Sequence, residues 1–436
     1  MAPPDQEPTA RQDAAQQHRS LRTAALGTAL VFTASGTLLG TWVSRIPAIV
    51  KQLDVTAGEL GRALLALGIG SLLSMPVTGH ICRRVGSRTW VAITAFVAAV
   101  VLGCVGLADN LVQLGVVLFG LGLVYGSWDV SMNVQGSAVD RRAGREWMPR
   151  YHACWSLGSI AGAALGSLAA RNDVPIGMHF TIAAVGAAVV TYVGLLGYVD
   201  ERADHRDQGG PGRLKAGEQP GERRRKRVAT NPALLLVGAL TLCASVIEGA
   251  AADWLALYLD TGRGLSEASA ALGYTVFATA MTVGRFLGTP LAGWLGRATA
   301  VRIGGFLGVA GVLLTVLSPW VPLTYAGALL WGAGICLVFP AAVSAAGETD
   351  RPAESIALVT SIGYGSILVG PPLIGALADV VGMGNALLTL AGLAAVVAIL
   401  APVVRQRPAA GAGGGTAGGS GETFDDGQPE SASIAR

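Results

Sequence analysis

The chain alternates long apolar segments with short polar ones over most of its length. Apolar runs of about twenty residues recur from Leu21 to Val404, and each is long enough to cross a hydrocarbon layer of roughly 30 Å as a helix. Because lipid offers no hydrogen bonds, the backbone groups of such runs must pair within their own helix. The pattern predicts an all-α polytopic membrane protein with twelve spans, six within residues 21–199 and six within residues 231–404.

Three polar segments flank and divide these spans. Residues 1–20 are polar and contain prolines, so we expect a disordered lead. Residues 200–230 hold Gly, Pro and the basic run 223–227, which predicts a solvated linker between two bundles. Residues 405–436 are rich in Gly and Ser, which is typical of a flexible tail.

The basic residues predict the orientation of the spans. Most of the 31 Lys and Arg lie in the linker, the two tails and the loops on the same side of the membrane. The positive-inside rule therefore predicts a protein of the cell inner (plasma) membrane with both termini in the cytoplasm. This rule accounts for the basic linker, and we expect no nucleic-acid partner.

Composition excludes several classes of protein. Hydrophobic residues make up 52% of the chain and charged residues only 14%, which does not fit a soluble domain. The 61 glycines favour close helix packing in lipid. The five Cys and five His show no ligand spacing, so we expect no metal and no cofactor. No Ser/His/Asp, HExxH or P-loop pattern is present, which predicts that the chain is not an enzyme and uses no nucleotide.

A weak internal repeat supports two similar halves. Trp42 precedes Leu60 by the same number of residues as Trp254 precedes Leu272. Many transporters are built from such repeated halves, with their binding site between them. The repeat therefore predicts two six-helix bundles related by pseudo-symmetry.

Residues 79–88, GHICRRVGSR, resemble the loop motif G-x-x-x-D-R-x-G-R-[RK] of the major facilitator superfamily. The matching residues are Gly79, Arg84, Gly86 and Arg88. In that family the charges of this loop brace one face of the protein against span eleven. Here Arg83 stands where the family has Asp, and we expect it to pair with Glu354 or Asp350 near the start of span eleven.

Span four carries a second likeness. Residues 122–133, GLVYGSWDVSMN, resemble the same stretch of the L-fucose:proton symporter group and of YbjJ-type inner-membrane transporters. The resemblance implies that Asp129 is the proton-titrating acid and that Asn133 contacts substrate. It also implies proton-coupled transport of a small polar, sugar-like solute through a cavity lined by spans one, four, seven and ten.

Charged groups inside the spans are costly, so each calls for a role. Asp129 lies about 12 Å from the end of its span, where burial favours the protonated carboxyl and Asn133 shares its face. Glu248 is a second candidate for proton coupling, or half of a structural ion pair. Arg285 lies at a similar depth to Asp129, which suggests an ion pair with Asp129 or, alternatively, with Glu248. Asp253 lies nearer the outer end and suits a gate.

Aromatic and polar side chains supply candidates for binding substrate. The candidates are Tyr151, His152 and Trp155 on span five, Trp42 on span one and Trp254 on span seven. Rings can stack on a small ligand while hydroxyl and ring nitrogen groups bond its edge. Packing between helices is the alternative role for each of them.

Three functions remain open from the sequence. The first is the proton-coupled transporter of a small polar solute, and the second is a proton-antiport exporter of drugs or natural products. Spans four and five lack the arginine and the proline expected of the drug antiporters, which favours the first. The third is a sensor or scaffold that moves nothing. Sodium coupling also stays open, and we expect a monomer in the bilayer whose partners are its substrate and protons.

Overall fold

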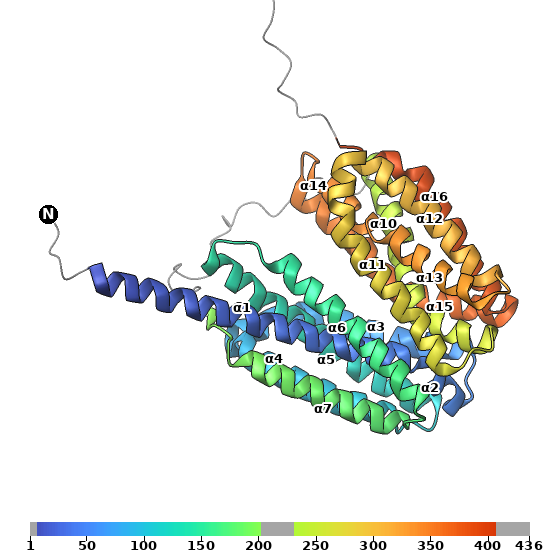
Figure 1. The fold of residues 1–436 in the computed structure, drawn as a ribbon, viewed down its shortest axis with the longest axis horizontal. Coiled ribbons are helices and arrows are strands. Elements are labelled where there is room, and N and C mark those ends of the chain that lie inside the picture. Colours follow the sequence, from blue (N-terminus) through green and yellow to red (C-terminus); the bar gives the residue numbers. More distant parts are fainter. Residues whose placement is uncertain (1–6, 202–230, 407–436) are drawn as a thin grey trace, which may run out of the picture.

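The computed structural model describes residues 7–201 and 231–406, and the elements within these ranges are helices (Figure 1). Most of the predicted linker and tail lie outside these ranges. Residues 7–20, which the sequence predicted to be a disordered lead, instead extend the first helix back to Glu7. This stretch is rich in Ala, Gln and Arg, which favour helix, and its single proline, Pro8, lies at the start of the helix.

Twelve helices of the described chain are long and apolar enough to cross a membrane, as the sequence predicted. The first six spans are α1 (Glu7–Ser44), α3 (Ala57–Val85), α4 (Ser87–Val105), α5 (Leu111–Ala143), α6 (Met148–Arg171) and α7 (Ile176–Leu195). A short helix, α2 (Ile46–Leu53), follows the first span.

The second six spans contain more interruptions. They are α10 (Pro232–Ala250) with the π-helical turns η1 (Ala251–Leu255) and η2 (Tyr258–Gly262), α11 (Glu267–Leu295), α12 (Arg297–Leu317), α13 (Val321–Ile335) with α14 (Val338–Gly347), α15 (Pro352–Val381), and α16 (Met383–Leu400) with the 3₁₀ turn η3 (Ala401–Val404). The break between α13 and α14 precedes Pro340, whose ring and missing N–H disturb the preceding turn of a helix.

Local signals at equivalent helix ends show the repeat of the two halves. Thr56 caps α3 by accepting from the backbone N–H of Glu59, and Ser266 caps α11 in the same way through Ser269. At their other ends, α3 stops at Gly86 with φ 87° and α11 stops at Gly296 with φ 82°. A left-handed φ at both positions favours glycine, so the same turn chemistry is used twice.

Glycine also sets the spacing of α1 and α6. A Cβ on Gly36 or Gly40 of α1 would meet the backbone oxygens of Trp155 or Ser159 on α6. Reciprocally, side chains at positions 158 and 162 of α6 would meet backbone oxygens of α1. Small residues four apart on both helices let the two backbones touch, as in other membrane helix pairs.

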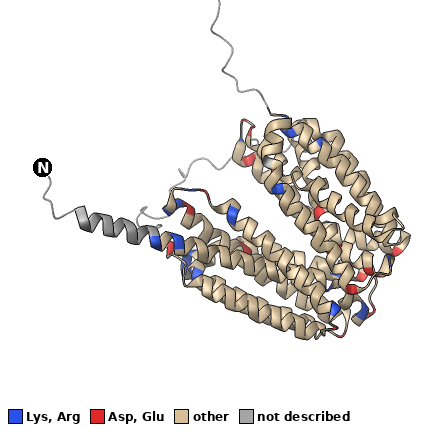
Figure 2. Ribbon diagram, in the orientation of Figure 1, with Lys and Arg blue, Asp and Glu red and all other residues tan. Residues whose placement is uncertain are grey.

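The two bundles meet at one face and separate toward the other (Figure 1). We call the face where α1 enters and α16 ends the terminal face, and the opposite face, which carries α2, the far face. Across the interface α3 packs against α15 and α6 packs against α11. Charged side chains gather near the helix ends, whereas the middle of each bundle is mostly uncharged (Figure 2).

Candidate functional site

A cavity of about 320 Å³ opens among α1, α3, α4, α5, α6 and α15, so both bundles contribute to it. Its aromatic lining residues are Trp42, Tyr125, Trp155 and Tyr364. The rest of the lining is mostly Leu with Met75, Gly68 and Ser71. Pockets of this kind, largely apolar with few polar groups, are typical of small-molecule sites.

Asp129 lies on α5 one turn from Tyr125, on the side toward the terminal face. The side-chain amide of Asn133 donates to the Asp129 carbonyl at 2.9 Å and to its Oδ1 at 3.4 Å. The two side chains therefore share a face, as their spacing predicted. A partly buried carboxyl beside an amide and a cavity can accept, hold and release a proton.

Glu248 and Arg285 form an ion pair between α10 and α11. The Arg285 Nη2 donates to Glu248 Oε1 at 2.9 Å and to Oε2 at 3.1 Å. About a third of each side chain is exposed. The sequence left two partners open for Arg285, and in this conformation the pair is with Glu248 and not with Asp129. The imidazole of His152 on α6 lies within electrostatic range of Arg285.

The structure brings some of the predicted aromatic residues together and separates others. Trp42 and Trp155 line the cavity, and Trp155 Nε1 donates to the Tyr125 hydroxyl at 3.3 Å. Tyr151 is buried against Phe32, with ring centroids 5.6 Å apart, and is a packing residue in this conformation.

His152 and the two candidates on span seven lie elsewhere. The His152 ring is exposed and meets the edge of Phe32. Trp254 is fully buried next to Gly375 of α15 and does not line the cavity. Asp253 is half-buried in the π-helical turn η1, and its role as a gate stays a prediction.

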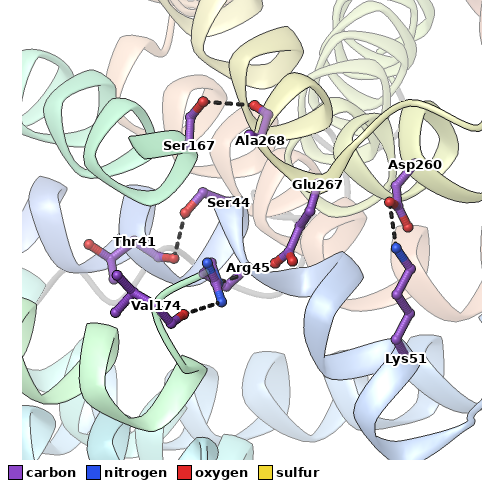
Figure 3. Close-up of polar contacts among 9 residues, drawn as sticks. All are labelled: Thr41, Ser44, Arg45, Lys51, Ser167, Val174, Asp260, Glu267 and Ala268. Carbon is purple, nitrogen blue, oxygen red and sulfur yellow. Dashed lines mark hydrogen bonds and ion pairs between the residues drawn. The ribbon is translucent and has the colours of Figure 1, made fainter. Parts of the chain in front are cut away.

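Two ion pairs join the bundles at the far face (Figure 3). Arg45, at the end of α1, places Nε 3.2 Å from Oε1 of Glu267 and donates from Nη2 to the Val174 carbonyl at 2.9 Å. Lys51 of α2 reaches Oδ1 of Asp260 at 2.7 Å. Burial lowers the pKa of the Arg45 guanidinium, and the charge of Glu267 opposes that shift.

Two further contacts close the same face. Ser167 of α6 donates to the carbonyl of Ala268 on α11 at 2.7 Å (Figure 3). Asp379 of α15 accepts from the Thr56 hydroxyl and from the Gly58 N–H, both at 3.0 Å. The two helix pairs, α6 with α11 and α3 with α15, are equivalent under the repeat. We call these two ion pairs and three hydrogen bonds the far-face latch.

Sequence reasoning missed the acceptor and donor residues of this latch. Loop charges are normal at a membrane surface, so their presence alone gave no reason to pair them. The repeat did contain a signal, because Thr56 and Ser266 start equivalent helices. This signal could have indicated that the two halves touch at the starts of α3 and α11, which lie at the far face.

At the terminal face the predicted pair with Arg83 is not formed. Arg83 and Arg84 are both exposed at the end of α3. Glu354, the expected partner, lies 3.6 Å from Arg351 one turn earlier on α15. Because the bundles are apart at this face, the pairing of Arg83 belongs to a state in which the face is closed, and it stays a prediction.

Twelve spans in two similar bundles, with a cavity between them that is shut at one face, are the architecture of a secondary transporter. The family model described as the Major Facilitator Superfamily matches residues 24–366. The chain belongs to this superfamily and is a membrane transporter, not an enzyme. Among the residues that the structure describes, no cluster of His, Cys, Asp and Glu could hold a metal ion.

Curated relatives span nearly the same length. The chain is 38% identical over 395 residues to "Uncharacterized transporter y4wD" of Sinorhizobium fredii, covering 89% of this chain and 100% of that one. It is 30% identical over 383 residues to an uncharacterized MFS-type transporter of Yersinia pestis, covering 87% of this chain and 96% of that one.

Solved structures share the fold at low identity. The nucleoside transporter NupG superposes with a TM-score of 0.69 at 14% identity, over 87% of this chain and 98% of that one. A bacterial homologue of the human lysosomal transporter Spinster, in an inward-facing and unoccupied conformation, gives a TM-score of 0.71 at 12% identity. That superposition covers 89% of this chain and 99% of the homologue.

Proposed function

We propose that this transporter is proton-coupled and that Asp129 is its proton-carrying group. The observation that carries the proposal is the position of this carboxyl, one turn from the cavity wall and joined to the amide of Asn133. A carboxyl at this depth loses its negative charge when it gains a proton. Because a charge inside the membrane is costly, the two protonation states favour different conformations of the protein. The resemblance of span four to the L-fucose:proton symporter group supports the same assignment.

Alternating access is the mechanism that this geometry supports. The far-face latch joins the bundles at one end of the interface, and the helices diverge at the other (Figure 1). We propose that the latch is one of two gates and that Arg83, Arg84 and Glu354 contribute to the second. With cytoplasmic termini, as the basic loops favour, this conformation opens to the cytoplasm.

The solute that we propose is small and carries polar groups. The polar side chains available to it include Asn133 beside Asp129, and the Glu248 to Arg285 pair, which lies within electrostatic range of His152. Together they can bond hydroxyl, amide or carboxylate groups of a sugar-like molecule. NupG, which shares the fold, is a nucleoside transporter, and a nucleoside combines such hydroxyls with a ring. Glu248 is a second candidate for the coupling proton.

Proton movement in proteoliposomes tests the proposal. Solutes from a panel of sugars, nucleosides and small acids are added, and the internal pH is followed with a fluorescent dye. We expect one class of solute to change the internal pH with the wild-type protein and not with Asp129→Asn. Asp109→Asn, a matched change at an exposed loop residue, should leave the signal intact.

The direction and the ion dependence of the signal separate the alternatives. Alkalinisation of the compartment from which the solute leaves indicates symport, whereas acidification indicates the antiport of an exporter. Solute uptake that needs sodium and ignores pH would contradict proton coupling. Uptake and pH signals that persist in Asp129→Asn would exclude Asp129 as the carrier.

A further inference from the structure

The wall of the cavity is more aromatic than a purely polar solute needs. Its four rings come from four helices and from both bundles: Trp42 from α1, Tyr125 from α5, Trp155 from α6 and Tyr364 from α15. Trp42 is 4% exposed and buried as part of the wall, whereas Tyr364 is 53% exposed. Rings on several sides of one space favour a flat guest, because faces and edges of aromatic rings attract one another.

The polar atoms of two of these rings already have partners in the protein. Trp155 Nε1 donates to the Tyr125 hydroxyl at 3.3 Å, and that hydroxyl donates to the Ser35 carbonyl at 3.2 Å. Trp155 and Tyr125 therefore line the cavity with polar atoms that are already bonded, and they have little capacity left to bond a guest. The other polar side chains of the wall are Trp42, Ser71 and Tyr364, so a molecule with many hydroxyls would bury several of them without partners, which is unfavourable.

A carboxyl group, that of Asp129, lies one turn away from Tyr125 along α5. Asp129 follows Tyr125 by four residues, which is about 6 Å along a helix, and Tyr364 lies within electrostatic reach of the Asp129 carboxyl. A guest with its flat part in the cavity could therefore extend a polar group toward Asp129 and Asn133.

We infer that the solute joins a planar unsaturated ring to a polar, hydrogen-bonding group, with the ring held between Trp155 and Tyr364. This inference rests on the proposed function, because it names the class of solute for the same cavity. It excludes free sugars and simple alkyl chains. A cavity of about 320 Å³ fits a molecule of one or two rings.

Fragments that differ only in planarity test the ring. The probes are phenol with cyclohexanol, benzoate with cyclohexanecarboxylate, and benzylamine with cyclohexylmethylamine, so that each pair keeps one polar group and its charge. Binding to the purified full-length protein in detergent is measured by saturation-transfer NMR. In at least one pair we expect the aromatic member to bind roughly three- to tenfold more tightly than the saturated one.

Two variants locate the binding, and one serves as a control. Trp155→Leu and Tyr364→Leu, one in each bundle, should each remove the aromatic preference. Trp320→Leu, at a tryptophan that is 61% exposed outside the cavity, should keep it. Tyr364 is exposed, so its replacement tests the ring without disturbing the core, and the thermal unfolding temperature of each variant confirms that it is folded.

The outcomes separate this inference from the proposed function. Three outcomes would overturn the ring site. They are equal binding within all three pairs, no binding by any fragment, and an aromatic preference that is retained in both leucine variants. Fragment binding together with a failure of solutes to move protons would leave the ring site standing and contradict proton coupling. Proton movement driven only by solutes without rings would support proton coupling and contradict the ring site.

Discussion

The side chain of Arg285 shows what the sequence could say about a single residue and what it could not. The depth of a residue along a span follows from counting residues, and the similar depths of Arg285 and Asp129 suggested an ion pair between them. Rotation about the helix axis also decides which groups meet, and the structure turns Arg285 toward Glu248. Asn133 and Asp129 do share a face, as their spacing on one helix predicted, and the structure adds a hydrogen bond between their side chains.

The Glu248 to Arg285 pair leads to a prediction about stability. Glu248→Gln or Arg285→Gln leaves one charge without its partner, and each should lower the thermal unfolding temperature by a few degrees, or about 1 kcal/mol for a pair that is one-third exposed. The double variant Glu248→Gln with Arg285→Gln removes both charges and should recover most of the loss. Unfolding of the purified variants is followed by intrinsic fluorescence. A double variant whose loss equals the sum of the single losses would show that the two residues act independently.

The helices themselves followed closely from the sequence. Hydrophobic length predicted the twelve spans, because that signal is local. Helix α1 begins at Glu7, within the stretch for which the sequence predicted a disordered lead. The short helix α2 and the π-helical turns η1 and η2 were not foreseen, since their backbone geometry depends on neighbours that are distant in sequence.

Contact between α1 and α6 leads to a prediction about helix packing. Gly162→Val should push the two helices apart, because a Cβ at this position would meet the Thr37 carbonyl, and overpacking of this kind costs about 1–3 kcal/mol. The matched change Gly186→Val lies on an exposed face of α7 with no atom within 4 Å of the added Cβ. It should leave the unfolding temperature nearly unchanged. Equal effects of the two variants would contradict a close helix contact.

For the whole molecule, the sequence predicted two bundles but not how they are joined. Thr56 and Asp379 are far apart along the chain, and no pattern of apolar residues connects them. The relative tilt of the bundles depends on such contacts, so only the three-dimensional structure reveals which face is shut. The sequence predicted a cavity lined by spans one, four, seven and ten, but only spans one and four of that set line the cavity that the structure contains. Among the described residues, no lining residue comes from span seven or ten, and the second bundle contributes Tyr364 and Leu368 of span eleven, which was not foreseen.

The far-face latch predicts how the conformational equilibrium responds to mutation. Asp379→Ala removes the acceptor of two hydrogen bonds that join α3 to α15, and it should shift the population toward opening of the far face by roughly tenfold. Spin labels on α2 and on the loop before α11 would report this as a longer distance in pulsed electron resonance. Asp109→Ala, an exposed carboxylate on the same face, is the control. An unchanged distance distribution in Asp379→Ala would show that the latch does not hold this face shut.

The exposed arginines of the terminal face make the conformational change sensitive to ionic strength. Closing that face would bring Arg83 and Arg84 of α3 toward Arg351 of α15, and Glu354 offsets part of this positive charge. Repulsion between exposed charges weakens as ionic strength rises, because the Debye length falls from about 30 Å at 0.01 M to about 8 Å at 0.15 M. Dilute buffer therefore favours the conformation in which the terminal face is open, and added salt lowers the barrier to closing that face. The rate of exchange between the two arrangements should depend on the ionic strength of the solution that contacts the terminal face as well as on the solute.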